Sequence, residues 1–507
     1  MNLELLAFIL YFCLMLGIGI FFFVKSKGAG GDKEYFLGGR QMGPYVTAMS
    51  AQASDMSGWL LMGFPGSVLA FGFGKVWIGI GLALGTICNW IFVAKRLRRF
   101  SAAANDSITL PQYLSNRFAT KNPALQIICA TIFLVFFTVY VASSFVAGAT
   151  VFSEIIPQLK GNESLAMIIF VAIIICYTFL GGFKAVCWTD FFQGLMMLIA
   201  ILAVPIVILA TKDLNFDALN QVFSYTDGAS KETVECAFNS NLFSASWQDI
   251  VSGLAWGLGY FGMPHILVRF MSIKSPKMVK KSATVAIIWV ILSLGAAIVI
   301  AYFGRMLIAD QLLPFGLQKN VFIKLVQELF PPFLVGILLS AIIAAAMSTA
   351  DSQLLVASSS FTSDIYKPIF RKKASDKEVS WVGRIVVLII AVVAYFIASS
   401  KSAGAQSIMN MVENAWGGFG SAFGGVIILS LFWKRLTYKG AIAAVAGGAV
   451  VDVFWLVFLT SSTGVYELLP GFVSGVVLAV VVSLIDKKPS KEVEDIFERA
   501  TDKSIDF

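Results

Sequence analysis

The chain has 507 residues, of which 58% are hydrophobic and only 13% are charged, and its mean hydropathy is +0.82. Because a soluble chain usually carries about 25% charged residues, this composition predicts an all-α polytopic membrane protein. The formal net charge is +8, yet no soluble basic face with interleaved aromatics is visible, so no nucleic-acid partner is expected. A single histidine and the absence of any CxxC pair argue against a metal centre.

A helix needs about 20 apolar residues to cross a bilayer, and on that basis the sequence predicts about 13 transmembrane helices. In chain order they run near residues 6–24, 45–73, 76–94, 124–153, 163–183, 187–210, 250–270, 283–304, 332–360, 382–399, 406–431, 440–460 and 468–485. When the N-terminus is put outside, the basic clusters at 95–99, 277–281 and 371–373 all fall on the inner side, as the positive-inside rule requires. We therefore expect a multi-pass protein of the plasma membrane with a cytoplasmic C-terminus and its positive charge against membrane lipid.

Two of these spans are interrupted by residues that loosen a helix. The second contains ASDMSG at 53–58, and the seventh contains GLAWGLGYFGMPH at 253–265. They occupy corresponding places in spans 2–6 and 7–11, which is typical of a transporter with its site between two inverted repeats. The expected division is an N-terminal extra span and cytoplasmic loop (1–44), inverted repeat 1 (45–211), an extracellular loop (212–249), inverted repeat 2 (250–431), two C-terminal spans (432–486) and a cytoplasmic tail (487–507).

Asp55, in the middle of the second span, is the only charged residue between Arg40 and Lys75. A carboxylate at the centre of a bilayer costs several kcal/mol unless it has a partner. It is either a structural carboxylate, bonded to backbone amides that the break frees, or part of a cation site. The segment offers no basic partner, which favours a mobile cation.

The ninth span, SAIIAAAMSTADSQLL at 340–355, offers a complement to this carboxylate. Ala345, Ser348 and Thr349 are spaced i, i+3, i+4 and share one helix face. Hydroxyl and carbonyl oxygens suit a small alkali cation. The alternative is a small-residue face for close helix packing, with Ser and Thr bonding across helices.

In the seventh span, Trp256 and Tyr260 stand at i, i+4 among glycines. They either pack in the core or wall a small apolar substrate whose anionic group meets a half-helix N-terminus. His265 is better interpreted as a packing histidine than as a proton relay.

Other charges near the spans are less informative. Lys184 and Asp190 bracket a turn at the inner face and are interpreted as a solvated loop pair, while Asp351, Glu413 and Asp452 have no assigned role. The chain contains no GxxxxGK[ST] loop, nucleophile elbow or HExxH motif, so we expect neither a nucleotide partner nor an enzyme.

Seven stretches in chain order resemble the sodium/solute symporter family, and most of all its proline-transporting members. They are EYFLGGR (34–40), AQASDMSGWLLMG (51–63), ITLPQYLSNRF (108–118), FFTVYVASSFVAGA (136–149), GGFKAVCWTD (181–190), WGLGYFGMPHILVRF (256–270) and AAAMSTADSQLL (344–355). The resemblance implies a leucine-transporter-like fold, in which spans 2–6 and 7–11 form two inverted five-helix repeats.

The resemblance also implies the residues of the site. The implied sodium ligands are the carbonyls of Ala53, Met56 and Ala345 and the hydroxyls of Ser348 and Thr349, with Asp55 capturing the ion or organising the site. The implied substrate contacts are Ser57, Trp59, Tyr140, Trp256, Tyr260 and Pro264. Arg40 and Asp190 resemble residues that couple sodium to the substrate.

We therefore expect sodium-coupled, electrogenic uptake of L-proline by alternating access, with Na⁺ as the co-transported ion and no organic cofactor. Two alternatives stay open. One is a sodium- or proton-coupled symporter of another small organic solute, in which Asp55 or His265 would be the titrating group. The other is a sodium channel or solute receptor without coupled uptake.

Overall fold

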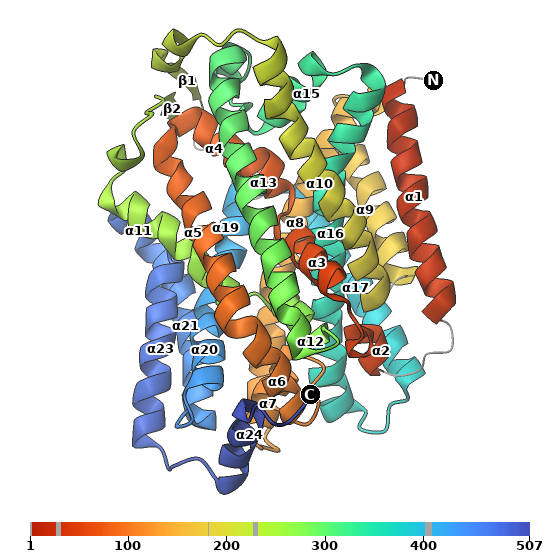
Figure 1. Cartoon of the computed structure of the whole chain (residues 1–507), viewed down its shortest axis with the longest axis vertical. Helices are drawn as coiled ribbons and strands as arrows, with labels where there is room; N and C mark the ends of the chain where they lie inside the picture. Colours follow the sequence, from red (N-terminus) through yellow and green to blue (C-terminus); the bar gives the residue numbers. More distant parts are fainter. Residues whose placement is uncertain (1–2, 27–31, 181, 227–231, 401–407) are drawn as a thin grey trace.

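The computed structural model describes residues 3–26, 32–180, 182–226, 232–400 and 408–507. Most of these residues form long helices that run side by side along the longest axis of the molecule (Figure 1). A small antiparallel hairpin, β1 (Phe223–Thr226) with β2 (Thr233–Cys236), lies at one end of the bundle, and α24 (Lys491–Thr501) lies at the opposite end. Gly181 of the GGFKAVCWTD stretch and positions 406–407 of the expected eleventh span lie outside the described residues.

The long unbroken helices are α1 (Leu3–Ser26), α8 (Ala124–Ile155), α9 (Glu163–Leu180), α10 (Phe183–Thr211), α13 (Val279–Leu307), α16 (Pro332–Ser360), α17 (Asp376–Ser399), α21 (Tyr438–Phe458) and α23 (Leu468–Ile485). Other segments are assembled from consecutive pieces. They are α3 (Pro44–Asp55), η2 (Trp59–Gly63) and α4 (Phe64–Phe71); α5 (Val76–Cys88), η4 (Asn89–Ala94) and α6 (Lys95–Ala103); α11 (Trp247–Ala255), η8 (Trp256–Phe261) and α12 (Pro264–Ser272); and α19 (Ile408–Phe419), η13 (Gly420–Gly424) and α20 (Gly425–Phe432).

Short helices connect these segments. They are α2 (Asp32–Leu37), η1 (Gly38–Arg40), η3 (Phe73–Lys75), α7 (Leu110–Arg117), η5 (Pro157–Leu159), η6 (Phe216–Asn220), η7 (Leu242–Ser244), η9 (Pro276–Met278), α14 (Ala309–Leu312), η10 (Leu313–Phe315), η11 (Gln318–Asn320), α15 (Val321–Leu329), η12 (Phe361–Phe370) and α22 (Thr460–Thr463).

Within the described residues, ten helices are long and apolar enough to cross a membrane, or eleven if the bent pair Trp247–Phe261 and Pro264–Ser272 is one span. The sequence predicts about 13. The two expected spans that are not among these are the second, which is broken after Asp55, and the fifth, of which the searched residues give only the stretch Glu163–Cys176. The count of 13 therefore stays a prediction, whereas the multi-pass, mostly helical architecture is confirmed.

The burial of the helices sorts them into a centre and a periphery. In α16 and in the helix from α19 to α20, 83% of the residues in the most apolar stretch are buried, compared with 28% in α1, α21 and α23. The peripheral helices expose large apolar side chains such as Phe454 and Phe458, which lipid covers in a membrane. The broken segment α3 packs against α10, α12, α13 and α16. The second segment thus has its break inside the bundle, and in the seventh segment every residue of α12 is buried, whereas α11 lies at the edge of the molecule (Figure 1).

Candidate functional site

The break in the second segment falls at the predicted place and leaves a backbone carbonyl free. Helix α3 ends at Asp55, and Met56 has φ −85° and ψ 73°, outside the helical region. In a continuous helix the amide of Ser57 would donate to Ala53, but here it donates to the carbonyl of Asp55 at 3.0 Å. The Ala53 carbonyl is thereby available to another partner.

That partner is the hydroxyl of Ser348, which donates to the Ala53 carbonyl at 2.7 Å. The same hydroxyl lies 3.2 Å from the carbonyl of Ala345, one turn earlier in α16. The next residue, Thr349, is fully buried, and among the described residues its hydroxyl has no hydrogen-bond partner. Three of the five predicted sodium ligands therefore meet, and Thr349 is adjacent to them. Met56 is buried directly after the end of α3.

Asp55 is bound by tyrosine hydroxyls. Its side chain is 5% exposed, and the hydroxyl of Tyr260 donates to Oδ2 at 2.6 Å. The hydroxyl of Tyr140 donates to the backbone carbonyl of Asp55 at 3.5 Å. The ion pairs found among the described residues do not include Asp55. Of the predicted substrate contacts, Tyr260 therefore holds the carboxylate and Tyr140 the backbone carbonyl, two residues after the Ala53 carbonyl that Ser348 contacts.

Stacked aromatic rings adjoin the tyrosines. Trp59 and Trp256, from the two interrupted segments, lie 5.8 Å apart with their planes at 29°. Trp256 also stacks on Tyr466 at 5.4 Å, and Trp416 packs edge-on against Tyr260 at 5.0 Å. We call Trp59, Trp256, Tyr260, Trp416 and Tyr466 the aromatic wall. The sequence identifies the first three as candidates but misses the last two, because Trp416 is one aromatic of an apolar span and Tyr466 lies in the loop before α23.

The remaining predicted substrate contacts lie at helix starts. The hydroxyl of Ser57 accepts from the amide of Trp59 at 3.3 Å, so it caps the short helix that follows the break. Pro264 occupies the first turn of α12, where its missing N–H costs nothing. His265 is buried, and its ring packs edge-on against Phe137 at 5.8 Å and near Tyr140 at 6.4 Å.

Asp190 is not part of a solvated loop pair, so that interpretation is wrong. It is fully buried in α10, and its Oδ2 accepts from Arg269 at 3.0 Å and from Ser50 at 2.7 Å. Lys184 pairs instead with Glu34 at 3.9 Å. An unpaired carboxylate buried at this position would be strongly destabilising, and Arg269 neutralises it inside the bundle.

The same arginine links this ion pair to α16. Arg269 donates to the hydroxyl of Ser352 at 2.5 Å, and that hydroxyl contacts Oδ1 of Asp351 at 3.3 Å. Arg269 thus contacts Asp190 directly and is linked to Asp351 through Ser352, which lies one turn after Ser348 in α16. Arg269 is the one charged residue of the stretch WGLGYFGMPHILVRF, and a charge in this apolar segment is the sequence signal that could have identified it.

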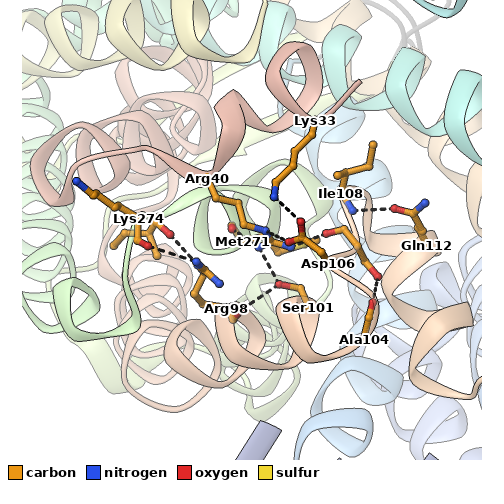
Figure 2. Close-up of polar contacts among 12 residues, drawn as sticks. Lys33, Arg40, Arg98, Ser101, Ala104, Asp106, Ile108, Gln112, Met271 and Lys274 are labelled. Atoms are coloured by element: carbon orange, nitrogen blue, oxygen red, sulfur yellow. Dashed lines mark hydrogen bonds and ion pairs between the residues drawn. The ribbon is translucent and has the colours of Figure 1, made fainter. Parts of the chain in front are cut away.

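Arg40 lies at the end of the bundle that carries α24, where it joins several segments (Figure 2). Its guanidinium donates to the Asp106 carboxylate at 2.7 Å, to the carbonyl of Ser107 at 2.7 Å and to the carbonyl of Met271 at 2.5 Å. Lys33 also pairs with Asp106. Arg40 is 5% exposed and has φ 56°, a left-handed conformation that persists only where surrounding contacts hold it.

Asp106 is a member of this network that the sequence interpretation missed. Burial raises its pKa, but the hydrogen bond from Lys33 and the charges of Arg40 and Lys33 outweigh burial and hold the pKa below its ordinary value. Arg98 connects the network further by donating to the carbonyl of Ile273 at 2.7 Å (Figure 2). The connection ties α6 and the loop after it to the end of α12.

Glu413 and Asp452 have their hydrogen bonds among the C-terminal segments. The hydroxyl of Tyr466 donates to the backbone carbonyl of Glu413 at 2.7 Å, and the hydroxyl of Ser421 donates to Asp452 at 2.7 Å. The first contact joins the loop before α23 to α19, and the second joins η13 to α21, so neither reaches the oxygen cluster at Ser348.

The sequence model of the sodium:solute symporter family matches residues 35–448. The chain belongs to this family. It is 42% identical over 504 residues to a sodium/proline symporter of Haemophilus influenzae, covering 98% of this chain and 97% of that one. It is 45% identical over 496 residues to sodium/proline symporter 2 of Staphylococcus saprophyticus, covering 96% and 93% respectively.

Solved transporters share the fold of this family member. A Na⁺-coupled sialic acid symporter in a substrate-bound, outward-open state matches with a TM-score of 0.71 at 19% identity, over 97% of this chain and 99% of that one. The nucleobase–cation symporter Mhp1 in a closed conformation matches with a TM-score of 0.56 at 14% identity, over 92% and 98%. Both are leucine-transporter-like proteins, so that part of the predicted fold class is confirmed.

Proposed function

We propose that this protein takes up L-proline by sodium-coupled, electrogenic symport. The observation that carries the proposal is the contact between Ser348 and the carbonyl of Ala53 at the break of α3. It joins hydroxyl and carbonyl oxygens from two helices, and these are the ligands that a small hard cation prefers. The relatives named sodium/proline symporters, at 42% and 45% identity over nearly the whole chain, support both the ion and the solute.

Sodium, the co-transported ion, would bind between α3 and α16. Its ligands would be the carbonyls of Ala53, Met56 and Ala345 and the hydroxyls of Ser348 and Thr349. The buried hydroxyl of Thr349, which has no partner among the described residues, supports this assignment. Asp55 would first capture the ion or hold the broken segment in shape, since its carboxylate is bound by Tyr260.

Proline would bind beside the ion against the aromatic wall. Trp59 and Trp256 offer the ring faces that suit a small apolar ring, and the hydroxyls of Ser57, Tyr140 and Tyr260 offer polar contacts. The N-terminus of α12, at Pro264, carries the positive end of a helix dipole and would favour the carboxylate of the substrate.

Transport would follow from rocking of one inverted repeat against the other. Arg40 and Asp190 would couple the two cargoes by closing the α24 end and by fixing α10 against α12. We place the N-terminus outside and the C-terminus in the cytoplasm, in keeping with the chain ends at opposite ends of the bundle (Figure 1). One sodium ion moving down about 100 mV and a tenfold gradient releases about 3.7 kcal/mol, enough for roughly a few-hundred-fold accumulation.

Uptake of labelled proline into proteoliposomes under an imposed sodium gradient tests the proposal. We expect Asp55→Asn to abolish nearly all sodium-driven uptake while the protein still inserts into the membrane. The control is Asp310→Asn, which removes an exposed carboxylate of α14 and should leave uptake at the native level. Uptake that ignores sodium would refute the coupling. Competition by another solute but not by proline would refute the substrate.

Proton coupling is the second candidate, because Asp55 is held by a neutral tyrosine hydroxyl and a proton would neutralise it as well as a sodium ion. Uptake driven by a pH gradient in sodium-free medium would favour this alternative. A sodium current that proceeds without stoichiometric proline uptake would instead indicate a channel or receptor.

A further inference from the structure

A basic cavity lies at the α24 end of the bundle, and none of the proposed site residues lines it. Its volume is about 390 Å³, within the range of about 300–1,000 Å³ that is usual for small-molecule sites. Its walls are α6, η9 and the end of the chain from Ala500 to Asp506. Five lining residues are basic and one is acidic: Lys95, Arg96, Arg99, Lys277, Lys503 and Asp506.

The positive charge of this cavity is mostly unneutralised. Asp506 pairs with Lys277 at 3.1 Å. Arg99 donates to the carbonyls of Ala500 at 2.8 Å and Ile505 at 3.1 Å, which orient its guanidinium without cancelling its charge. Arg96 is oriented in the same way, since it donates to the Leu431 carbonyl at 2.9 Å and 3.1 Å. The ion pairs of the described residues include neither Lys95 nor Lys503.

One wall of the cavity continues into a lipid-facing surface. Ile91 and Phe92, in η4, are 55% and 56% exposed, and Lys95, the first residue of α6, is exposed too, whereas the two residues between them are buried. Exposed apolar side chains on a membrane helix lie against acyl chains. On the other wall, exposed Lys280 and Lys281 follow η9. The cavity therefore lies where acyl chains give way to headgroups.

We infer that this cavity binds the phosphate-bearing headgroup of an anionic phospholipid from the adjoining leaflet. Basic pockets between helices at this depth suit such headgroups, and each nearby lysine or arginine adds to the attraction. The acyl chains would run along Ile91 and Phe92. Free phosphate shares the chemistry of the headgroup, but it would gain nothing from this apolar surface.

The bound headgroup would also hold neighbouring segments together. It would tie the end of α24 to η9 and to α6. From α6, Arg98 contacts the Ile273 carbonyl and Ser101 accepts from Arg40 at 3.1 Å. The lipid would therefore stabilise the contacts that this end of the bundle makes in the structure.

Native mass spectrometry of the purified protein with phosphatidylglycerol or phosphatidylcholine of matched acyl chains tests the inference. Lys95→Gln/Lys503→Gln should weaken phosphatidylglycerol binding about 30-fold and leave phosphatidylcholine binding unchanged. The matched control is Lys372→Gln/Lys373→Gln, which removes two exposed charges from the loop between η12 and α17. Equal phosphatidylglycerol affinity in the native, double and control proteins would overturn the inference.

Two further arms separate the lipid from other causes. Displacement of phosphatidylglycerol by an equal concentration of inorganic phosphate or glycerol phosphate would show that the ligand is a soluble anion and refute the lipid assignment. Lys95→Arg/Lys503→Arg keeps both charges and should bind phosphatidylglycerol with native affinity. If the glutamine variant lost affinity because any change at these two positions misfolds the protein, the arginine variant would lose it too. Raising the salt from 0.1 M to 1 M shortens the screening length from about 10 Å to about 3 Å and should bring the native protein to the affinity of the glutamine variant.

Discussion

Ser348 joins two helices across 295 positions of sequence with one hydrogen bond. The bond exists because the chain turns out of helix after Asp55 and the Ala53 carbonyl loses its usual partner within α3. A sodium ion placed there would compete for the same oxygens, so the hydroxyl serves as a link without the ion and as a ligand with it. The two roles explain why a hydroxyl, rather than a methyl group, is useful at this position.

We expect Ser348→Ala to raise the sodium concentration needed for half-maximal uptake by about tenfold, because one ligand worth about 1.5 kcal/mol is lost. The sodium dependence of proline uptake in proteoliposomes measures this change. Ser340→Ala is the matched control, since that hydroxyl lies in the same helix and donates only to the Gly336 carbonyl at 2.7 Å. An equal shift in both variants would assign the effect to α16 as a whole.

At the scale of elements, the glycines of the seventh segment allow close packing as well as a break. A Cβ on Gly259 would lie 2.0 Å from Nε1 of Trp416, and one on Gly262 would lie 2.3 Å from the Phe419 carbonyl. The short helix η8 therefore presses against α19 and η13 with no space for a side chain. This approach allows the Trp416 indole to donate to the Trp256 carbonyl at 2.8 Å and complete the aromatic wall.

Gly259→Ala should destabilise the protein by about 1–3 kcal/mol through overpacking and weaken proline binding, because Trp416 must move. Thermal unfolding of the purified protein, with and without proline, measures both effects. Gly295→Ala in α13 is the control, since a Cβ at that position would meet no other atom within 4 Å and alanine favours a helix. A native midpoint in Gly259→Ala would show that η8 tolerates displacement from α19.

At the scale of the whole molecule, the α24 end of the bundle is held by charged contacts between distant segments. Arg40 lies after α2, Asp106 lies after α6, and Met271 lies near the end of α12 (Figure 2). Alternating access requires this end to open, and a polar network with a partly exposed carboxylate separates more readily than a packed apolar core. The network is therefore suited to an interface that forms and breaks during transport.

Acid should loosen this end. The pKa of Asp106 is lower in the folded protein than its ordinary value, so its stabilisation is present above about pH 4 and is lost as the pH falls through the lowered pKa. Hydrogen exchange of the amides at 104–109, corrected for the intrinsic rate, should be constant near neutral pH and rise in acid.

Asp106→Asn should raise this exchange at neutral pH and remove its dependence on acid. Asp376→Asn, which removes an exposed carboxylate of the first turn of α17 that pairs with Lys367 at 3.8 Å, provides the comparison. Unchanged protection in Asp106→Asn would mean that Arg40 is held mainly by backbone carbonyls.

Local features of the sequence predict the multi-pass helical class, the break after Asp55 and the candidate ligands on α16, because composition and helical spacing act over a few turns. The resemblance adds Tyr140 and Arg40, whose roles no local pattern indicates. Asp190 is the clearest failure, since its place beside a turn suggests solvent and its partner is 79 residues away.

The tertiary structure alone decides which distant groups meet. Arg269 neutralises Asp190, Trp416 and Tyr466 extend the aromatic wall, and Asp106 receives Arg40. Each of these pairs depends on how whole helices pack, and packing is set by the sum of many weak contacts rather than by the residues of one segment. The sequence by itself thus determines where the helices can break and what oxygens they offer, while the assembled bundle determines which charges and rings face one another.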